Sequence, residues 1–216
     1  MRLIIGNKNY SSWSLRAWLL MRVKNIAFEE ERIPLDQADT KARILKYSSA
    51  GRVPVLIDGD TTVWDSLAIV EYLADKFPTL GIWPQAPEPR AQARSISAEM
   101  HSGFAALRSA MPMNCRSAYP GKGVTPASTA DIARITALWE DCRKRFGAAG
   151  PFLFGEFSAA DAFYAPVVSR FLTYAVPLTP ISQRYVEAVS ALPAMREWVG
   201  SASTESEFIA ADEPYR

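Results

Sequence analysis

The sequence predicts an α/β domain followed by an all-helical domain. Short β-forming runs alternate with helical runs up to about residue 77, and every later run has the apolar spacing of a helix. Four prolines cluster between residues 78 and 89, which is typical of a linker. We therefore expect a first domain over residues 1–80, a linker over 81–89 and a helical-bundle domain over 90–216.

The first domain is expected to have the element order β-α-β-α-β-β-α. Its strands are predicted over residues 2–6, 28–33, 53–57 and 61–64. Its helices are predicted over residues 14–24, 38–47 and 65–77. Ser14 is the expected cap of the first helix, and Asp58-Gly59 is a strong turn signal within the hairpin. This order matches a thioredoxin-like domain, in which the first strand–helix–strand crossover is right-handed.

The second domain is expected to contain only helices. They are predicted over residues 90–111, 126–146 and 158–174, with two more beginning near residues 180 and 194. Ser158 and Asp161 have the spacing of a capping box, in which each side chain bonds the other residue's backbone N–H. We assign no chemistry to this box.

Composition excludes several classes of function. Lys and Arg total 24 against 23 Asp and Glu, so the net charge of +1 provides no field that favours nucleic acid or a membrane surface. No apolar stretch has transmembrane length. The two cysteines, Cys115 and Cys142, and the single His101 offer neither a disulfide framework nor metal-ligand spacing. We expect a cytoplasmic protein that binds no metal, nucleic acid or membrane.

Two dipeptides flank the predicted hairpin, Val53-Pro54 before it and Asp65-Ser66 after it. This arrangement resembles the glutathione-binding half of the glutathione transferases, where a Val-Pro pair with a cis proline opens a strand. The resemblance implies that Val53 and Pro54 bind glutathione through backbone groups, as an added strand would. It also implies that Asp65 and Ser66 hold the γ-glutamyl end at a helix N-terminus. The Ser158 box after Gly155 extends the resemblance into the helical domain.

The loop before the first helix carries the expected chemistry. The run from Ser11 to Arg16, Ser-Ser-Trp-Ser-Leu-Arg, resembles the Ser-Ser-Cys-Ser-Trp-Arg pattern of the zeta class, with Trp13 in place of the cysteine. The absence of a cysteine in this loop excludes Cys-x-x-Cys redox chemistry. In serine-type transferases a serine donates a hydrogen bond to the glutathione sulfur. An ungapped match selects Ser11, and a theta- or delta-like count from the arginine selects Ser12.

Further site residues follow from the resemblance. Tyr10 is a third candidate for the sulfur, because other classes use a tyrosine on this loop. Lys41 and Arg52 are the expected cations for the glycyl carboxylate of glutathione. The residues expected to line the pocket for the electrophile are Tyr10, Trp13, Met100, His101, Phe104 and Arg108. The roles of His101 and Cys115 stay open at this point.

The resemblance implies a serine-type glutathione transferase that joins glutathione to a small hydrophobic electrophile. One alternative is a zeta-like cis-trans isomerase of the maleylacetoacetate isomerase type, against which the replacement of cysteine by Trp13 counts. Another is a non-catalytic interaction module with the same fold, against which the retained hydroxyls of Ser11 and Ser12 count. A homodimer is expected, with Tyr72, Phe77 and Met111 available for a partner.

Overall fold

The computed structural model describes residues 1–216 and begins with a four-stranded sheet. The strands are β1 (Arg2–Ile5), β2 (Glu29–Arg32), β3 (Val55–Asp58) and β4 (Thr61–Trp64). They lie in the order β2-β1-β3-β4, with β1 parallel to β2 and antiparallel to β3, and with β3 antiparallel to β4. The sheet is therefore mixed.

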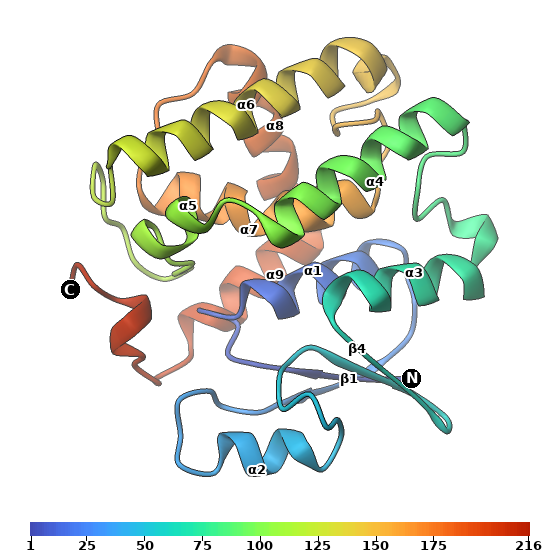
Figure 1. Ribbon diagram of the computed structural model, residues 1–216, viewed down its shortest axis with the longest axis vertical. Coiled ribbons are helices and arrows are strands. Elements are labelled where there is room, and N and C mark those ends of the chain that lie inside the picture. Colours follow the sequence, from blue (N-terminus) through green and yellow to red (C-terminus); the bar gives the residue numbers. More distant parts are fainter.

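Helices cover both faces of this sheet (Figure 1). Helices α1 (Ser12–Val23) and α3 (Ser66–Lys76) lie between the sheet and the rest of the molecule, and α2 (Thr40–Leu45) lies on the opposite face. Alternation along β1 explains this layering, because Leu3 and Ile5 enter the large core whereas Ile4 enters a small cluster with Ile44 of α2. The predicted β-α-β-α-β-β-α order is confirmed.

The rest of the chain is helical, as predicted. Its helices are α4 (Pro87–Ser102), α5 (Ala105–Ala110), α6 (Pro126–Phe146), α7 (Ala159–Thr173), α8 (Pro180–Ala191) and α9 (Pro193–Ser203), with 3-10 turns at Pro78–Leu80, Gly147–Ala149 and Ala210–Asp212. Helix α7 is buried along almost its whole length and packs against α1 and α4. The large hydrophobic core therefore runs without a break from the sheet into the helical part.

The predicted helix over residues 90–111 is wrong in two respects. It begins earlier, at Pro87, within the residues expected as linker, and it is interrupted between Ser102 and Ala105. At the break, Phe104 has a left-handed φ of 57°. A Cβ on Gly103 would lie 2.7 Å from the carbonyl oxygen of Glu99, so only glycine fits the close turn.

Helix α1 begins earlier than the sequence predicted. Ser11, not Ser14, is its N-cap, and the Ser11 hydroxyl accepts the backbone N–H of Ser14. The capping box of α7 is present as predicted, with Asp161 accepting the backbone N–H of Ser158 at 2.8 Å and of Leu153 at 3.0 Å. Burial raises the pKa of Asp161 to about 6, and these hydrogen bonds oppose the shift.

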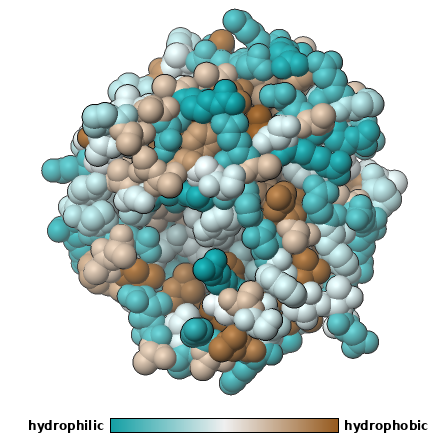
Figure 2. Space-filling view, viewed as in Figure 1, coloured by the Kyte–Doolittle hydropathy of each residue, from teal (hydrophilic) through white to brown (hydrophobic).

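None of the helices is both long enough and apolar enough to cross a membrane. No group of three or more His, Cys, Asp or Glu side chains is arranged to hold a metal ion. On the face shown in Figure 2, hydrophilic residues predominate and hydrophobic residues form small separate patches.

Candidate active site

Three segments that are distant in the sequence meet at one edge of the sheet. Ile4 pairs with Val55, and Val55 pairs with Trp64 across the antiparallel ladders. The residues that follow β1, precede β3 and follow β4 therefore lie side by side. These are the loop over residues 6–12, the pair Val53-Pro54 and the pair Asp65-Ser66, so the register brings the predicted site segments together.

The Val53-Pro54 segment presents free backbone groups. Its peptide bond is cis, and Pro54 is buried whereas Val53 is partly exposed. Val53 lies outside β3, and neither its N–H nor its C=O takes part in a turn, loop or cap hydrogen bond. These groups can therefore pair with an extended ligand that lies along the segment.

The Asp65-Ser66 pair begins α3. Asp65 is its N-cap, with a positive φ of 73°, and its Oδ1 accepts the backbone N–H of Leu67 at 2.8 Å. Ser66 is 1% exposed, and its hydroxyl has no hydrogen-bond partner. An unsatisfied buried hydroxyl costs about 1–3 kcal/mol, which a polar ligand at the helix N-terminus could offset.

The two candidate serines differ in what their hydroxyls contact. The Oγ atoms of Ser11 and Ser14 lie 2.7 Å apart, and Ser11 also accepts the Ser14 N–H at 3.4 Å. Ser12 is the first residue of α1 and is 8% exposed. Its hydroxyl forms no hydrogen bond with the chain and keeps some contact with solvent. Ser12 therefore has a free donor at the N-terminus of α1.

The hydroxyl of Tyr10 is held by the C-terminal segment. Its single O–H is directed at the carboxylate of Glu213 and the carbonyl oxygen of Glu207, and its oxygen accepts from Nη2 of Arg116 at 2.6 Å. Burial and the Glu213 carboxylate raise the pKa of Tyr10. This arrangement leaves the hydroxyl occupied, unlike that of Ser12.

Three of the predicted pocket residues lie together beside this edge. The rings of Trp13 and His101 are in edge contact with centroids 5.0 Å apart, and the guanidinium of Arg108 lies 5.3 Å from the Trp13 ring. Nε2 of His101 is 3.4 Å from Oδ2 of Asp65, which joins α4 to the N-terminus of α3. Met100 and Phe104 are instead part of the hydrophobic core.

Arg16 is a charged residue within this group that the sequence pattern did not assign to the site. The residue is 1% exposed, and its guanidinium lies 4.2 Å from the centre of the Trp13 ring and 4.9 Å from the centre of the Phe163 ring. Only Nη2 has an acceptor, the Met100 carbonyl at 3.4 Å, whereas Nε and Nη1 are buried without a partner. Burial, with Arg108 and Arg170 nearby, lowers the pKa of Arg16 to about 9.

The environment of His101 favours its neutral form. Burial lowers the pKa of His101, and the positive charges of Arg16 and Arg108 add to this effect while Asp65 opposes it. Nδ1 of His101 is buried without a partner. The lowered pKa therefore favours a neutral imidazole at neutral pH, with Nε2 close to the Asp65 carboxylate.

The two predicted cations lie near the start of β3. Lys41 and Arg52 are both exposed, and neither forms a salt bridge. The Lys41 side chain passes beside Gly51, because a Cβ on that glycine would lie 3.8 Å from the Lys41 Cε and Cγ atoms. Both cations are thus close in the chain or in space to Val53.

Cys115 is partly exposed, and its surroundings do not favour the thiolate. Its Sγ lies 3.5 Å from the Ser169 hydroxyl and 3.7 Å from the carbonyl oxygen of Lys8. Burial raises the pKa of Cys115 to about 11, so little thiolate forms at neutral pH. Cys142 is fully buried in the core.

Comparison with known proteins bears on this geometry. Residues 10–76 match the glutathione S-transferase N-terminal domain, and residues 123–201 match its C-terminal domain. Glutathione S-transferase Z2 of Arabidopsis thaliana is 30% identical over 210 residues, which cover 89% of this chain and 90% of that relative. The chain belongs to the glutathione S-transferase family.

Other comparisons agree with this family assignment. A probable maleylacetoacetate isomerase of Caenorhabditis elegans is 32% identical over 97 residues, and this match covers only 45% of each chain. A glutathione transferase homologue from Burkholderia, solved with bound glutathione, has the same fold. Its TM-score is 0.72 at 23% identity, covering 94% of this chain and 98% of that chain. The predicted family and fold are confirmed, and the family relationship identifies a glutathione-dependent transferase or isomerase.

Proposed function

We propose that this glutathione S-transferase binds glutathione along the edge of the sheet and activates its thiol with a serine hydroxyl. The observation that carries the proposal is the coincidence of free polar groups at this edge. They are the backbone of Val53, the buried hydroxyl of Ser66 and the hydroxyl of Ser12. Free donors and acceptors that converge on one edge are what an extended peptide-like ligand requires.

Glutathione would lie with its γ-glutamyl end at the N-terminus of α3. There the N–H groups of the first turn and the Ser66 hydroxyl favour a carboxylate, and Asp65 offers a negative charge to the ammonium group. The cysteinyl backbone would pair with Val53. Lys41 and Arg52, which have no salt-bridge partner, would serve the glycyl carboxylate.

Thiol activation requires only modest free energies. A free thiol has a pKa of about 8.5, and each unit of depression corresponds to about 1.4 kcal/mol. One hydrogen bond to a charged group supplies roughly 1.5–3 kcal/mol, and the dipole of α1 adds roughly 0.3–1 kcal/mol. Together these contributions correspond to a thiol pKa lower by one unit or more, so a substantial fraction of the glutathione sulfur would be thiolate near pH 7, ready to attack a small hydrophobic electrophile.

Single substitutions of the two serines test this activation. We expect Ser12→Ala to lower the turnover of a generic aryl halide by roughly 10- to 100-fold, with little change in glutathione affinity. Ser11→Ala is the companion variant, because the same change there removes the cap of α1. Full activity in Ser12→Ala with loss of activity in Ser11→Ala would transfer the donor role to Ser11. Full activity in both variants would refute serine activation.

A second candidate is a glutathione-dependent cis-trans isomerase, supported by one observation. The buried guanidinium of Arg16 has two unpaired nitrogens, and Arg108 lies on the same Trp13 ring. This positive environment suits a substrate that carries carboxylates, as maleylacetoacetate does. Turnover of such a substrate, with a low rate on the aryl halide, would select the isomerase. Retention on glutathione-agarose without either activity would indicate a non-catalytic module.

We also propose a homodimer, in which the first domain of one subunit packs on the helical domain of the other. Tyr72 and Phe77 are partly exposed and can contribute to such an interface, whereas Met111 is fully buried and cannot. The exposed Trp64 of β4 is a further candidate. Light scattering tests the proposal, because a monomer would have a mass near 23.9 kDa.

A further inference from the structure

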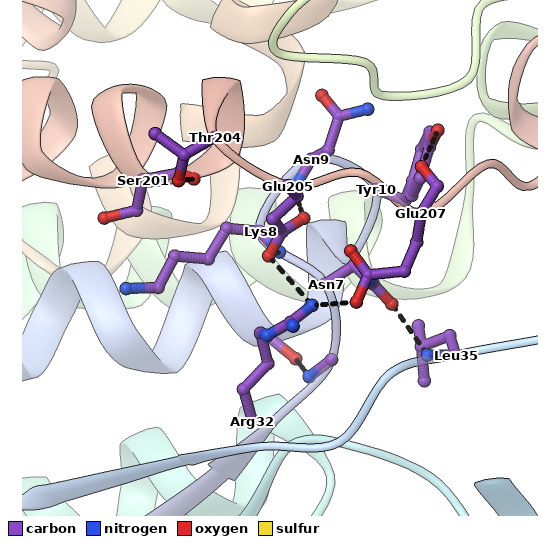
Figure 3. A network of polar contacts seen from close by, with 12 residues as sticks. Asn7, Lys8, Asn9, Tyr10, Arg32, Leu35, Ser201, Thr204, Glu205 and Glu207 are labelled. Carbon is purple, nitrogen blue, oxygen red and sulfur yellow. Dashed lines mark hydrogen bonds and ion pairs between the residues drawn. The ribbon is translucent and has the colours of Figure 1, made fainter.

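The loop that precedes the candidate serines is held by residues from the end of the chain. Figure 3 shows the carboxylate of Glu205 directed at this loop. Its Oε1 accepts the backbone N–H of Lys8 at 2.8 Å, and its Oε2 accepts the backbone N–H of Asn9 at 3.0 Å. One carboxylate therefore satisfies two consecutive backbone donors that lie just before Ser11 and Ser12.

The carbonyl groups of the same two residues are also taken up by the helical part. Trp198 of α9 donates from Nε1 to the Lys8 carbonyl at 2.8 Å, and the Cys115 backbone N–H donates to the Asn9 carbonyl at 3.3 Å. Both the N–H and the C=O of Lys8 are thus bonded to this end of the chain, the C=O to Trp198 of α9 and the N–H to Glu205 just after α9. Lys8 is 7% exposed and Asn9 is fully buried, so water could not readily replace these partners.

Glu205 is itself firmly placed. Its backbone N–H donates to the Ala202 carbonyl at 3.2 Å, and the Thr204 hydroxyl donates to the Ser201 carbonyl at 2.8 Å, so the end of α9 is closed by hydrogen bonds. Arg32 of β2 lies 3.4 Å from Oε1 of Glu205 and 2.7 Å from Glu207. The carboxylate is therefore aligned by both the helix and a neighbouring cation.

The position of the serines depends on this loop. The Asn7 carbonyl accepts the backbone N–H groups of Tyr10 at 3.2 Å and of Ser11 at 2.8 Å, which forms a tight turn. The peptide groups bound by Glu205 lie within that turn. If they rotated to find other acceptors, Ser11 and Ser12 would move with them, and small misplacements of reacting groups are costly in rate.

We propose that Glu205 is a positioning residue for thiol activation, acting from the end of α9 through the Lys8 and Asn9 backbone on the serines of α1. This inference rests on the proposed function. A carboxylate suits this place, because it accepts two N–H donors more strongly than a neutral group does.

The test compares Glu205→Gln and Glu205→Ala with Glu207→Gln as a matched control. The amide in Glu205→Gln keeps the shape but presents an NH₂ group to one backbone donor. Glu207→Gln removes the ion pair with Arg32 and leaves the Glu207 carbonyl bonds to Tyr10 and Arg116 intact. The control therefore has the same chemical change two residues away, without a contact to the Lys8 or Asn9 backbone.

The readouts are the pH profile of kcat, which reports the enzyme–substrate complex, and the glutathione Kd from calorimetry. We expect Glu205→Gln to raise the apparent pKa of the kcat profile by about one unit, which lowers kcat about tenfold on its acidic side. The glutathione Kd should change less than about threefold, because its proposed contacts lie on β3 and α3. Glu205→Ala should show a larger shift.

An unchanged kcat profile in folded Glu205→Gln would overturn the inference, as would an equal shift in Glu207→Gln. Circular dichroism establishes folding, and Glu205→Gln decides the matter if Glu205→Ala does not fold. Failure of the proposed function is a separate result, since the wild-type enzyme would then show no glutathione-dependent turnover at all.

Discussion

The two loops that meet at the sheet edge use their backbone groups in opposite ways. Around Val53 and Ser66, polar groups are left without partners inside the chain. In Lys8 and Asn9, both backbone N–H groups and both C=O groups are bonded to residues beyond the first domain. Under the proposed function, binding and activation would therefore be supported separately, because one loop would offer groups to glutathione and the other would hold the serines in place.

Substitution of Arg116 tests the loop around Lys8 and Asn9, which residues from the end of the chain hold in place. It should have the largest effect. Arg116 bonds Tyr10 and the carboxylate of Glu213, whose side chain is only 2% exposed. Arg116→Leu would remove the cation that lies 2.8 Å from that buried carboxylate and leave only the exposed Arg216 at 3.6 Å, so we expect a loss of roughly 3 kcal/mol in the free energy of unfolding. Urea denaturation measures this loss.

Arg145→Leu is the matched control for Arg116→Leu. Arg145 pairs with Glu88 and Asp141, and all three side chains are well exposed. The loss should stay below about 1 kcal/mol, as for other surface pairs. Equal losses in the two variants would mean that the C-terminal segment contributes no more than a surface ion pair.

Acid should weaken the same contact. Burial of Glu213 opposes its ionisation, but hydrogen bonds from Tyr10 and Arg116 outweigh this effect and lower the pKa of Glu213. A lowered carboxyl pKa stabilises the fold above the usual glutamate pKa, and this stabilisation is lost as pH falls through the lowered value. The stability difference between the wild type and Glu213→Gln should therefore shrink as pH falls below the ordinary glutamate pKa of about 4.3, and vanish only below the lowered pKa of Glu213. A difference that stays constant from pH 7 to pH 3 would contradict this explanation.

At the segments around Val53 and Ser66, where polar groups lack partners in the chain, we expect Ser66→Ala to weaken glutathione binding about tenfold without lowering stability. The hydroxyl has no partner in the chain, so its removal costs no internal hydrogen bond, whereas a bound carboxylate would lose one worth about 1.5 kcal/mol. Calorimetry and thermal melting measure the two quantities.

Ser97→Ala is the control for Ser66→Ala, since Ser97 on α4 is also fully buried and its hydroxyl also lacks a partner. Its glutathione affinity should equal that of the wild type. A similar loss of affinity in both variants would point to a general change in packing instead of a lost contact.

The smallest effect separates the two serines by stability. Ser11→Ala removes the N-cap of α1 and should lower the free energy of unfolding by about 1 kcal/mol. Ser12→Ala removes a hydroxyl that bonds nothing in the chain and should leave stability unchanged. Denaturation of both variants decides this, and a larger loss in Ser12→Ala would reverse the assignment of the cap.

The sequence was sufficient to predict the fold and the segments around Val53 and Ser66 that meet at the edge of the sheet. Hairpin signals, strand composition and capping residues are local, and Val53, Asp65 and Ser66 stand in a recognisable order around the hairpin. The break at Gly103 was not predicted, because the apolar spacing continues across it and the steric conflict with Glu99 appears only in three dimensions.

The contacts that Glu205 and Trp198 make with the loop at Lys8 and Asn9 could not be predicted, because they join residues nearly 200 positions apart. Glu205 and Lys8 are separated by 197 residues, and nothing in the polar composition of the C-terminal segment distinguishes Glu205 from Glu207. Arg16 had a weak signal, since it lies four residues after Ser12 and thus on the same face of α1. Its burial between two aromatic rings had none.

The most direct test of serine activation is the pKa of the glutathione thiol when glutathione is bound to the wild-type enzyme. Thiolate absorbance in the ultraviolet, recorded against pH with saturating enzyme, gives the pKa of the bound thiol. A serine hydroxyl at the N-terminus of α1 predicts a value one to two units below the free-thiol value of about 8.5. A bound thiol with the pKa of free glutathione would contradict serine activation, even if glutathione still binds along Val53 and Ser66.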